Sequence, residues 1–181
     1  MASSDRVRCF VTLDLPPQIK AEAKKVQTHL KQLSLFDGRY TRSENIHLTL
    51  KFLGAVDSSK IKQVQDCLKQ IQFSRPMIKM EHVGMCAPSI IWVKVDGADE
   101  IQGEVDRVLS PMFEPENRFM GHLTIARVKK KQKPSGLAES LEEIPVESIS
   151  ARSESLSLYQ SVLTHEGPTY SVLQRYDFLP G

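Results

Sequence analysis

Two short segments of the chain share one pattern, in which a histidine, an apolar residue, a threonine and a second apolar residue follow one another. The segments are His47-Leu48-Thr49-Leu50 and His122-Leu123-Thr124-Ile125. With 5 histidines among 181 residues, one copy would be weak evidence, because short motifs arise by chance. Two copies in matching surroundings indicate a paired site.

Each copy lies in a predicted β-strand, over residues 46–53 and 119–128. Side chains alternate between the two faces of a strand, so His47 and Thr49 share one face while Leu48 and Leu50 lie on the other. The second copy alternates in the same way. Each strand therefore presents an imidazole and a hydroxyl about 6.5 to 7 Å apart along the backbone, above an apolar anchor.

Two such units suit the cleavage of a phosphodiester. One histidine that titrates near neutral pH can deprotonate the attacking oxygen, and another can protonate the leaving oxygen. Threonine hydroxyls can donate to the non-bridging oxygens, where negative charge grows in the transition state. This division of labour needs no metal ion.

A metal site is the alternative use of two histidines on neighbouring strands. A divalent ion would need a further ligand such as a carboxylate, and neither motif contains Asp or Glu. The nearest acid, Glu44, is three residues before His47 and off its face. We therefore expect no metal and no other cofactor.

The hydrophobic pattern predicts the elements that position these motifs. Before the first motif we expect a strand over Val7–Leu13, a helix from Pro17 and a turn at Asp37-Gly38. The first motif strand should end at Gly54, and Asp57 or Ser58 should cap the next helix. The later expected elements are strands 77–86 and 89–96 joined at Ala87-Pro88, a helix over 101–112, the second motif strand, a short polar segment over 135–143, and strands 149–159 and 169–178. Many intervals are too short for helical crossovers, so the fold class is α+β with antiparallel sheets.

Composition limits the classes of protein that the chain can represent. At 181 residues, with 40% hydrophobic and 25% charged residues, it fits one compact domain or two very small ones and is not disordered. A net charge of +2 excludes binding of nucleic acid or membrane chiefly through bulk charge. The three cysteines are far apart and residues 1–8 lack an apolar signal segment, so we expect a cytoplasmic protein.

The sequence resembles the two-histidine (2H) phosphoesterase superfamily, and most closely its RNA 2',3'-cyclic phosphodiesterases, also called 2'-5' RNA ligases. The resemblance covers nearly the whole chain, and the segments that carry it are 8–11, 44–54, 121–127 and 163–170. It implies one bilobal domain over residues 1–181, in which two pseudo-symmetric lobes of antiparallel sheet flanked by helices each contribute one motif to a central cleft. It also implies that a 2',3'-cyclic phosphate on RNA or a nucleotide is opened to a 2'-phosphate without a metal.

The resemblance assigns a role to each motif residue. His47 would be the proton donor to the departing 3' oxygen, and His122 the acceptor that activates water. Thr49 and Thr124 would contact the phosphate. Arg127 matches a basic position that often follows the second motif, but strict alternation aims it away from the site, so it needs a bulge or a strand end to reach phosphate.

Four further features are open to two interpretations. Lys51 shares the face of His47 and could touch phosphate or simply be solvated. Trp92 alternates with Ile90 and is expected in the core rather than under a nucleobase, while His82 is expected to have a structural role. A basic run could be a solvated loop or could steer RNA; it comprises Arg127, Lys129, Lys130, Lys131 and Lys133.

The expected partners are RNA ends or nucleotides that carry a 2',3'-cyclic phosphate, with no membrane contact and with the chain as a monomer. Three other activities remain open on the same motifs: joining of RNA ends through a 2'-5' linkage, cleavage of 2'-5' oligonucleotides or cyclic nucleotides, and noncatalytic RNA binding by an adaptor. The intact pairs of His and Thr argue against the adaptor, because binding needs no matched acid and base.

Overall fold

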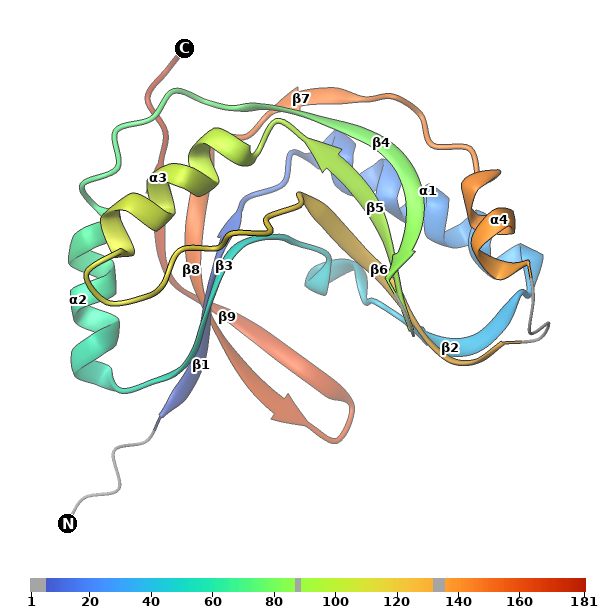
Figure 1. Cartoon of the computed structure of the whole chain (residues 1–181), viewed down its shortest axis with the longest axis horizontal. Helices are drawn as coiled ribbons and strands as arrows, with labels where there is room; N and C mark the ends of the chain where they lie inside the picture. The colour runs from blue at the N-terminus through green and yellow to red at the C-terminus, as the bar shows by residue number, and fades with distance from the viewer. Residues whose placement is uncertain (1–5, 87–88, 132–135) are drawn as a thin grey trace.

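One antiparallel sheet organises the molecule (Figure 1). The computed structural model describes residues 6–86, 89–131 and 136–181, and over these ranges nine strands follow the order β7-β4-β5-β6-β3-β1-β8-β9, with β2 also paired to β6. The strands are β1 Val7–Leu13, β2 Phe36–Tyr40, β3 Leu48–Val56, β4 Met77–Cys86, β5 Ile90–Asp96, β6 His122–Lys131, β7 Ser150–Arg152, β8 Ser155–Thr164 and β9 Gly167–Asp177. The helices are α1 Pro17–Leu33, the 3-10 turn η1 Ser43–Asn45, α2 Ser58–Leu68, α3 Asp99–Leu109 and α4 Leu137–Glu142. The expected α+β class is confirmed.

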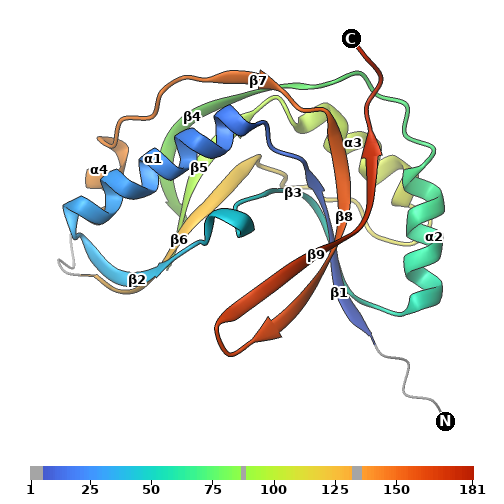
Figure 2. The same cartoon turned by 180° about the vertical axis from the view of Figure 1, so that it is seen from behind.

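The sheet consists of two half-sheets that meet at the two motifs. The first comprises β3, β1, β8 and β9, and the second comprises β7, β4, β5, β6 and β2. They are joined where Leu48 of β3 pairs with Leu123 of β6, which are the inner apolar residues of the two motifs. Helices α2 and α3 lie beside the first half-sheet in Figure 1, and α1 lies along the second in Figure 2. The fold therefore places the two histidine strands side by side at its centre.

The two long expected helices near the N-terminus form for the reasons that their sequences indicate. In α1, which begins at Pro17, four apolar residues at helical spacing are buried, namely Ile19, Ala23, Val26 and Leu30, whereas Leu33 at the end of the helix is exposed. In α2, the carboxylate of Asp57 accepts a hydrogen bond from the amide of Lys60 at 2.9 Å and caps the first turn. These helices bury one face of the half-sheets and leave the motif face open.

A β-bulge lies at the last residue of each motif. Along β3, the pairing with β1 passes from Thr49 to Lys51 in one step and leaves Leu50 as the extra residue. Along β6, the pairing with β5 passes from Thr124 to Ala126 and leaves Ile125 as the extra residue. Each bulge inverts the alternation of the residues beyond it.

Several expected boundaries differ in the structure. The expected turn at Asp37-Gly38 is wrong, because β2 runs through it and pairs with β6. Gly38 serves close packing there, since a Cβ on it would lie 2.2 Å from the carbonyl oxygen of Arg127. The first motif strand continues through Gly54 to Val56, the 149–159 strand divides into β7 and β8, and residues 137–142 form α4. The connection expected at residues 87–88 and Lys133 of the basic run lie outside the described residues.

Candidate active site

The two motif histidines have the same local geometry. His47 directly precedes β3 and His122 begins β6. Nδ1 of His47 lies 2.6 Å from the carbonyl oxygen of Asn45, and Nδ1 of His122 lies 2.7 Å from that of Met120. A carbonyl oxygen only accepts, so each Nδ1 carries the hydrogen and each Nε2 is the nitrogen left to take up or release a proton. In both cases a backbone carbonyl thus orients the ring for proton transfer through Nε2.

The threonines lie between the histidines on one face of the sheet, which we call the histidine face. In an antiparallel pair centred on Leu48 and Leu123, the position after one residue lies opposite the position before the other. Thr49 therefore neighbours His122, and Thr124 neighbours His47. All four side chains are partly exposed. The arrangement gathers two imidazoles and two hydroxyl donors around one small space.

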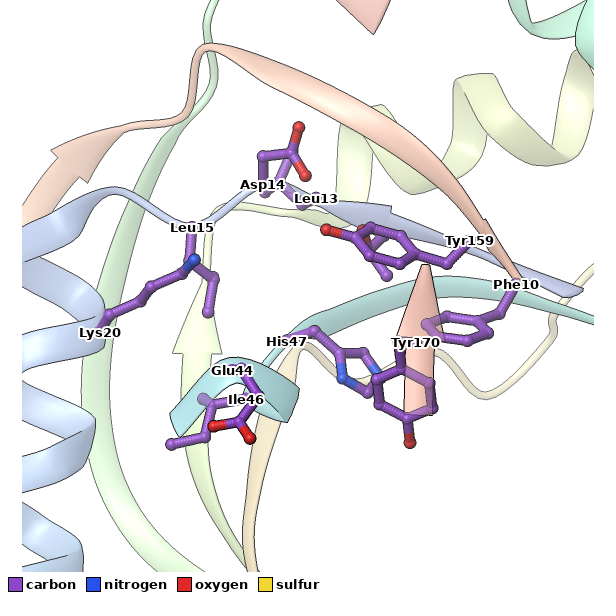
Figure 3. A pocket seen from close by; sticks show the side chains of 11 residues that line it. Phe10, Leu13, Asp14, Leu15, Lys20, Glu44, Ile46, His47, Tyr159 and Tyr170 are labelled. Carbon is purple, nitrogen blue, oxygen red and sulfur yellow. The ribbon is translucent and has the colours of Figure 1, made fainter. Parts of the chain in front are cut away.

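Aromatic rings surround His47 on the first half-sheet (Figure 3). Its ring centroid lies 5.0 Å from that of Phe10 and 5.2 Å from that of Tyr170. Burial lowers the pKa of His47; the hydrogen bond to the Asn45 carbonyl opposes this effect, and the nearby His122 adds to it. The net shift is downward, so the neutral ring is favoured until an anion binds beside it.

A small pocket of about 30 Å³ opens beside His47, between β1, β8 and η1 (Figure 3). This volume holds about one or two water molecules. Of its charged residues, Asp14 accepts from the hydroxyls of Ser155 and Ser157, and its carboxylate is directed away from His47. This space is too small to enclose a nucleoside.

Arg127 reaches the histidine face because of the bulge at Ile125. Its backbone pairs with Ile90 beyond the bulge, and its side chain is exposed. The guanidinium lies near enough to Tyr170 for its charge to oppose the rise that burial causes in the pKa of that phenol. The bulge that Arg127 needs to face the site is therefore present.

A buried glutamine holds this bulge from behind. Nε2 of Gln27 in α1 donates to the carbonyl oxygen of Ile125 at 2.7 Å and to that of Thr41 at 2.8 Å. The Ile125 oxygen also accepts from the amide of Thr41 at 2.9 Å. Because Gln27 is 4% exposed, these bonds are shielded from water and fix the path of β6 just before Arg127.

Lys51 has a different role from the one expected. The bulge at Leu50 turns it to the face opposite His47, where its ammonium is buried against the carboxylate of Asp106 in α3. Its Nζ also donates to the carbonyl oxygen of Glu114 at 2.6 Å. Lys51 is therefore committed to holding α3 and the segment after it, and the predicted phosphate contact is wrong.

The same bulge exposes an aromatic ring that was not expected from the sequence. Phe52 pairs with Phe10 across β3 and β1 on the histidine face, and it is 73% exposed. The signal was available in the spacing, since Phe52 and Arg127 each follow their motif histidine by five residues. The two side chains occupy corresponding positions in the two half-sheets.

Of the remaining candidates, Trp92 and the basic run differ from expectation, whereas His82, expected to have a structural role, packs its ring against that of Trp92 at 5.9 Å. Trp92 is partly exposed on the histidine face opposite Thr124, while Ile91 and Val93 supply the core. His82 is exposed, because the register of β4 shifts between Met80 and Val83. The described lysines of the basic run, residues 129–131, continue the exposed end of β6 rather than a loop.

Two other classes of site have no counterpart in the described part of the chain. No three side chains of His, Cys, Asp or Glu gather there in a group that could hold a metal ion. None of the described helices has the length and apolar character required to cross a membrane.

Comparison with known families and proteins supports a phosphoesterase. The model of the LigT like Phosphoesterase family matches twice, over residues 13–92 and 93–170. A protein of Methanocaldococcus jannaschii named RNA 2',3'-cyclic phosphodiesterase is 32% identical over 94% of this chain and 100% of its own length. One with the same name from Thermotoga maritima is 28% identical, with 97% of both chains covered.

Solved structures show the same fold at lower identity. A Thermus thermophilus protein superposes with a TM-score of 0.77 at 19% identity and covers 94% of this chain and 97% of its own. E. coli LigT complexed with 3'-AMP gives a TM-score of 0.73 at 19% identity and covers 97% and 99%. Both confirm the bilobal antiparallel architecture.

Proposed function

Because the chain belongs to the LigT-like phosphoesterase family, we propose that it hydrolyses the terminal 2',3'-cyclic phosphate of RNA to a 2'-phosphate. The observation that carries the proposal is the pair of matched histidines, each with Nδ1 at hydrogen-bond distance from a backbone carbonyl oxygen, which assigns proton transfer to Nε2. The names of its relatives, RNA 2',3'-cyclic phosphodiesterase, supply the substrate class.

The reaction uses one histidine as base and the other as acid. Nε2 of His122 takes a proton from water as the water oxygen bonds to phosphorus. The bond from phosphorus to O3' breaks, and Nε2 of His47 gives its proton to O3'. Exchange with solvent then returns both rings to their starting states. Each positioned imidazole contributes roughly 10² to 10⁴-fold to the rate.

The phosphate oxygens are held by the groups around the two rings. The hydroxyls of Thr49 and Thr124 donate to the non-bridging oxygens of the phosphate. Arg127, which lies on the second half-sheet, offsets the negative charge of these oxygens. The bound phosphate also raises the lowered pKa of His47, because an anion favours the protonated ring. Substrate binding thereby charges the acid that the reaction needs.

The nucleoside that carries the cyclic phosphate lies on the first half-sheet. Its O3' has to meet His47, and the surface beside His47 is aromatic. Phe52 presents its exposed ring on this face, so we place the base of this nucleoside against it. E. coli LigT has been solved with 3'-AMP, NADP+ and ATP, all of which carry adenine.

The test is product analysis with matched histidine variants. Cyclic-phosphate RNA, incubated with the protein and EDTA, should yield a 2'-phosphate by mass and phosphorus NMR. His47→Ala and His122→Ala should each lose at least about 100-fold in turnover. His165→Ala, at an exposed position in the β8–β9 connection, is the control and should retain activity. Full turnover by both motif variants would refute the assignment.

Three further properties complete the proposal. Residues 1–181 act as one bilobal domain, a view supported by half-sheets that each draw strands from distant parts of the chain. The protein acts as a monomer. It resides in the cytoplasm, a location consistent with three unpaired cysteines, Cys9, Cys67 and Cys86. RNA binding without any change in the terminal phosphate would favour the adaptor instead.

A further inference from the structure

Trp92 is an aromatic surface on the histidine face that hydrolysis of a cyclic phosphate leaves unused. It lies in β5 opposite Thr124, and Lys94, the next residue on its face, lies opposite His122. Trp92 and His122 are thus diagonal neighbours, about 7 to 8 Å apart at their Cα atoms. Phe52, in contrast, lies in the other half-sheet. Exposed or partly exposed aromatic rings therefore lie on both sides of the centre of the site.

The indole is fixed flat against the sheet. A Cβ built on Gly84 would lie 2.2 Å from Cη2 of Trp92 and 2.6 Å from both Cζ2 and Cζ3. These nearly equal distances place Gly84 under the face of the ring, since a point beyond the rim would be much farther from the two flanking atoms. Nε1 donates to Sγ of Cys86 at 3.2 Å, and the His82 ring meets the indole edge-on at 5.9 Å. One face is therefore covered by Gly84, these contacts hold the ring in place, and Trp92 remains partly exposed on the histidine face.

We infer that Trp92 stacks on a second nucleobase, that of a nucleoside whose 5'-hydroxyl takes the place of water beside His122. The inference rests on the proposed function and on its assignment of His122 as the base. The nucleophile enters on the side of His122, opposite the departing O3' at His47, and Trp92 is the large ring on that side. The first nucleobase occupies Phe52, so the two bases do not compete.

The reaction at this subsite is balanced without a cofactor. The 5'-hydroxyl gives its proton to His122 as its oxygen bonds to phosphorus. The bond from phosphorus to O3' breaks, and His47 protonates O3'. The product is a 2'-5' phosphodiester, and the reverse reaction cleaves such a linkage. Trp92 then determines how well a nucleoside competes with water, because it raises the local concentration of the hydroxyl.

Fluorescence tests the subsite directly, since the chain contains 1 tryptophan. The His47→Ala variant is titrated with 2'-5'-linked diadenosine monophosphate and, separately, with adenosine 2'-phosphate, and binding of each is measured by calorimetry. The dinucleotide should quench the emission on saturation, whereas the mononucleotide should leave it close to that of the free protein. Equal quenching by both, or bound dinucleotide without quenching, would overturn the inference.

The partition of products between joining and hydrolysis tests how far Trp92 helps a nucleoside to compete with water. The wild-type protein receives a cyclic-phosphate RNA and rising amounts of a 5'-hydroxyl oligoribonucleotide, and the ratio of joined to hydrolysed product is measured. Trp92→Ala should lower this ratio at least about fivefold through loss of stacking, and Trp92→Phe should lie between it and the wild type. Leu163→Ala, which truncates an exposed side chain of the β8–β9 hairpin, is the matched control.

The outcomes separate the inference from the proposed function. If the wild-type protein forms no joined product at any acceptor concentration, or if Trp92→Ala leaves the ratio of joined to hydrolysed product unchanged, the inference of a second nucleobase subsite is refuted. Hydrolysis of the cyclic phosphate would stand in either case. Absence of any reaction on the cyclic phosphate would refute the proposed function, and the fluorescence titration would still decide whether Trp92 meets a nucleobase.

Discussion

Replacing Lys51 by Met should destabilise the protein without weakening substrate binding. The side chains of Lys51 and Asp106 are 5% and 12% exposed, so their ion pair is screened little by water. Removing one member of a buried pair typically costs about 3 to 5 kcal/mol, because the other charge is left without compensation. Asp106 keeps the hydrogen bonds from Nε2 of Gln102 at 2.7 Å and the amide of Glu116 at 2.8 Å. We therefore expect a loss in the free energy of unfolding at the lower end of this range, about 3 kcal/mol.

The measurement is urea unfolding and thermal melting, together with kinetics on a cyclic nucleotide. A loss of about 3 kcal/mol corresponds to a fall in Tm of about 6 to 12 °C for a chain of this size. The KM, measured well below the Tm, should stay within about twofold of the wild-type value because Lys51 faces away from the site. Lys69→Met is the control: its pair with Asp66 is exposed, so the loss should be below about 1 kcal/mol.

A double variant tests whether the unpaired charge of Asp106 causes the loss of stability. Lys51→Met combined with Asp106→Asn removes both charges, so the double variant should be more stable than Lys51→Met alone.

A pH series provides an independent check. Burial alone would raise the pKa of Asp106, but hydrogen bonds from Lys51, the Glu116 amide and Gln102 lower it below its ordinary value. The stability that this shift contributes is present above about pH 3.9 and is lost as pH falls through the lowered pKa.

The difference in stability between wild type and Lys51→Met should accordingly shrink as the pH falls below about 4. Unchanged stability combined with a large rise in KM would refute this reasoning, because that result would mean that Lys51 meets the substrate after all.

Three further predictions concern the histidine face. His122→Gln should raise the pKa of His47, followed by NMR titration, because it removes a repelling charge; burial should still hold that pKa below about 6.5, and an unchanged value would contradict the proximity of the two rings. Gln27→Leu should lower the free energy of unfolding, measured in urea, by about 2 kcal/mol. It should also lower kcat/KM, because Arg127 lies just beyond the bulge that Gln27 supports; full activity would show that the bulge holds without Gln27. Phe52→Ala should raise the KM for a cyclic nucleotide about fivefold or more in steady-state assays, whereas Val162→Ala, which truncates another exposed side chain, should not; equal effects would place the base elsewhere.

Local patterns were sufficient where neighbouring residues alone decide the outcome. Alternation in a strand has a period of two, so the shared face of His47 and Thr49 follows from the sequence itself. Helical spacing likewise predicted α1, and the expected cap at Asp57 is confirmed. The antiparallel α+β class followed from the short intervals between strands.

Errors arose where a partner strand decides the outcome. Lys51 was expected beside His47, but pairing of β3 with β1 places a bulge between them and reverses its face. Trp92 was expected in the core, yet its position opposite Thr124 leaves it on the histidine face. Gly38 was expected in a turn, while its contact with the Arg127 backbone keeps it in a strand.

The sequence by itself predicted the groups that we propose perform the chemistry, two histidines and two threonines, because their types and their alternation are local properties. The tertiary structure decided which further side chains join them. The extra residue at the end of each motif, Leu50 or Ile125, exchanges Lys51 for Phe52 and brings Arg127 to the same face. Such a bulge depends on the register between strands that are distant in sequence, and on a buried Gln27 from another element, so no local pattern could locate it.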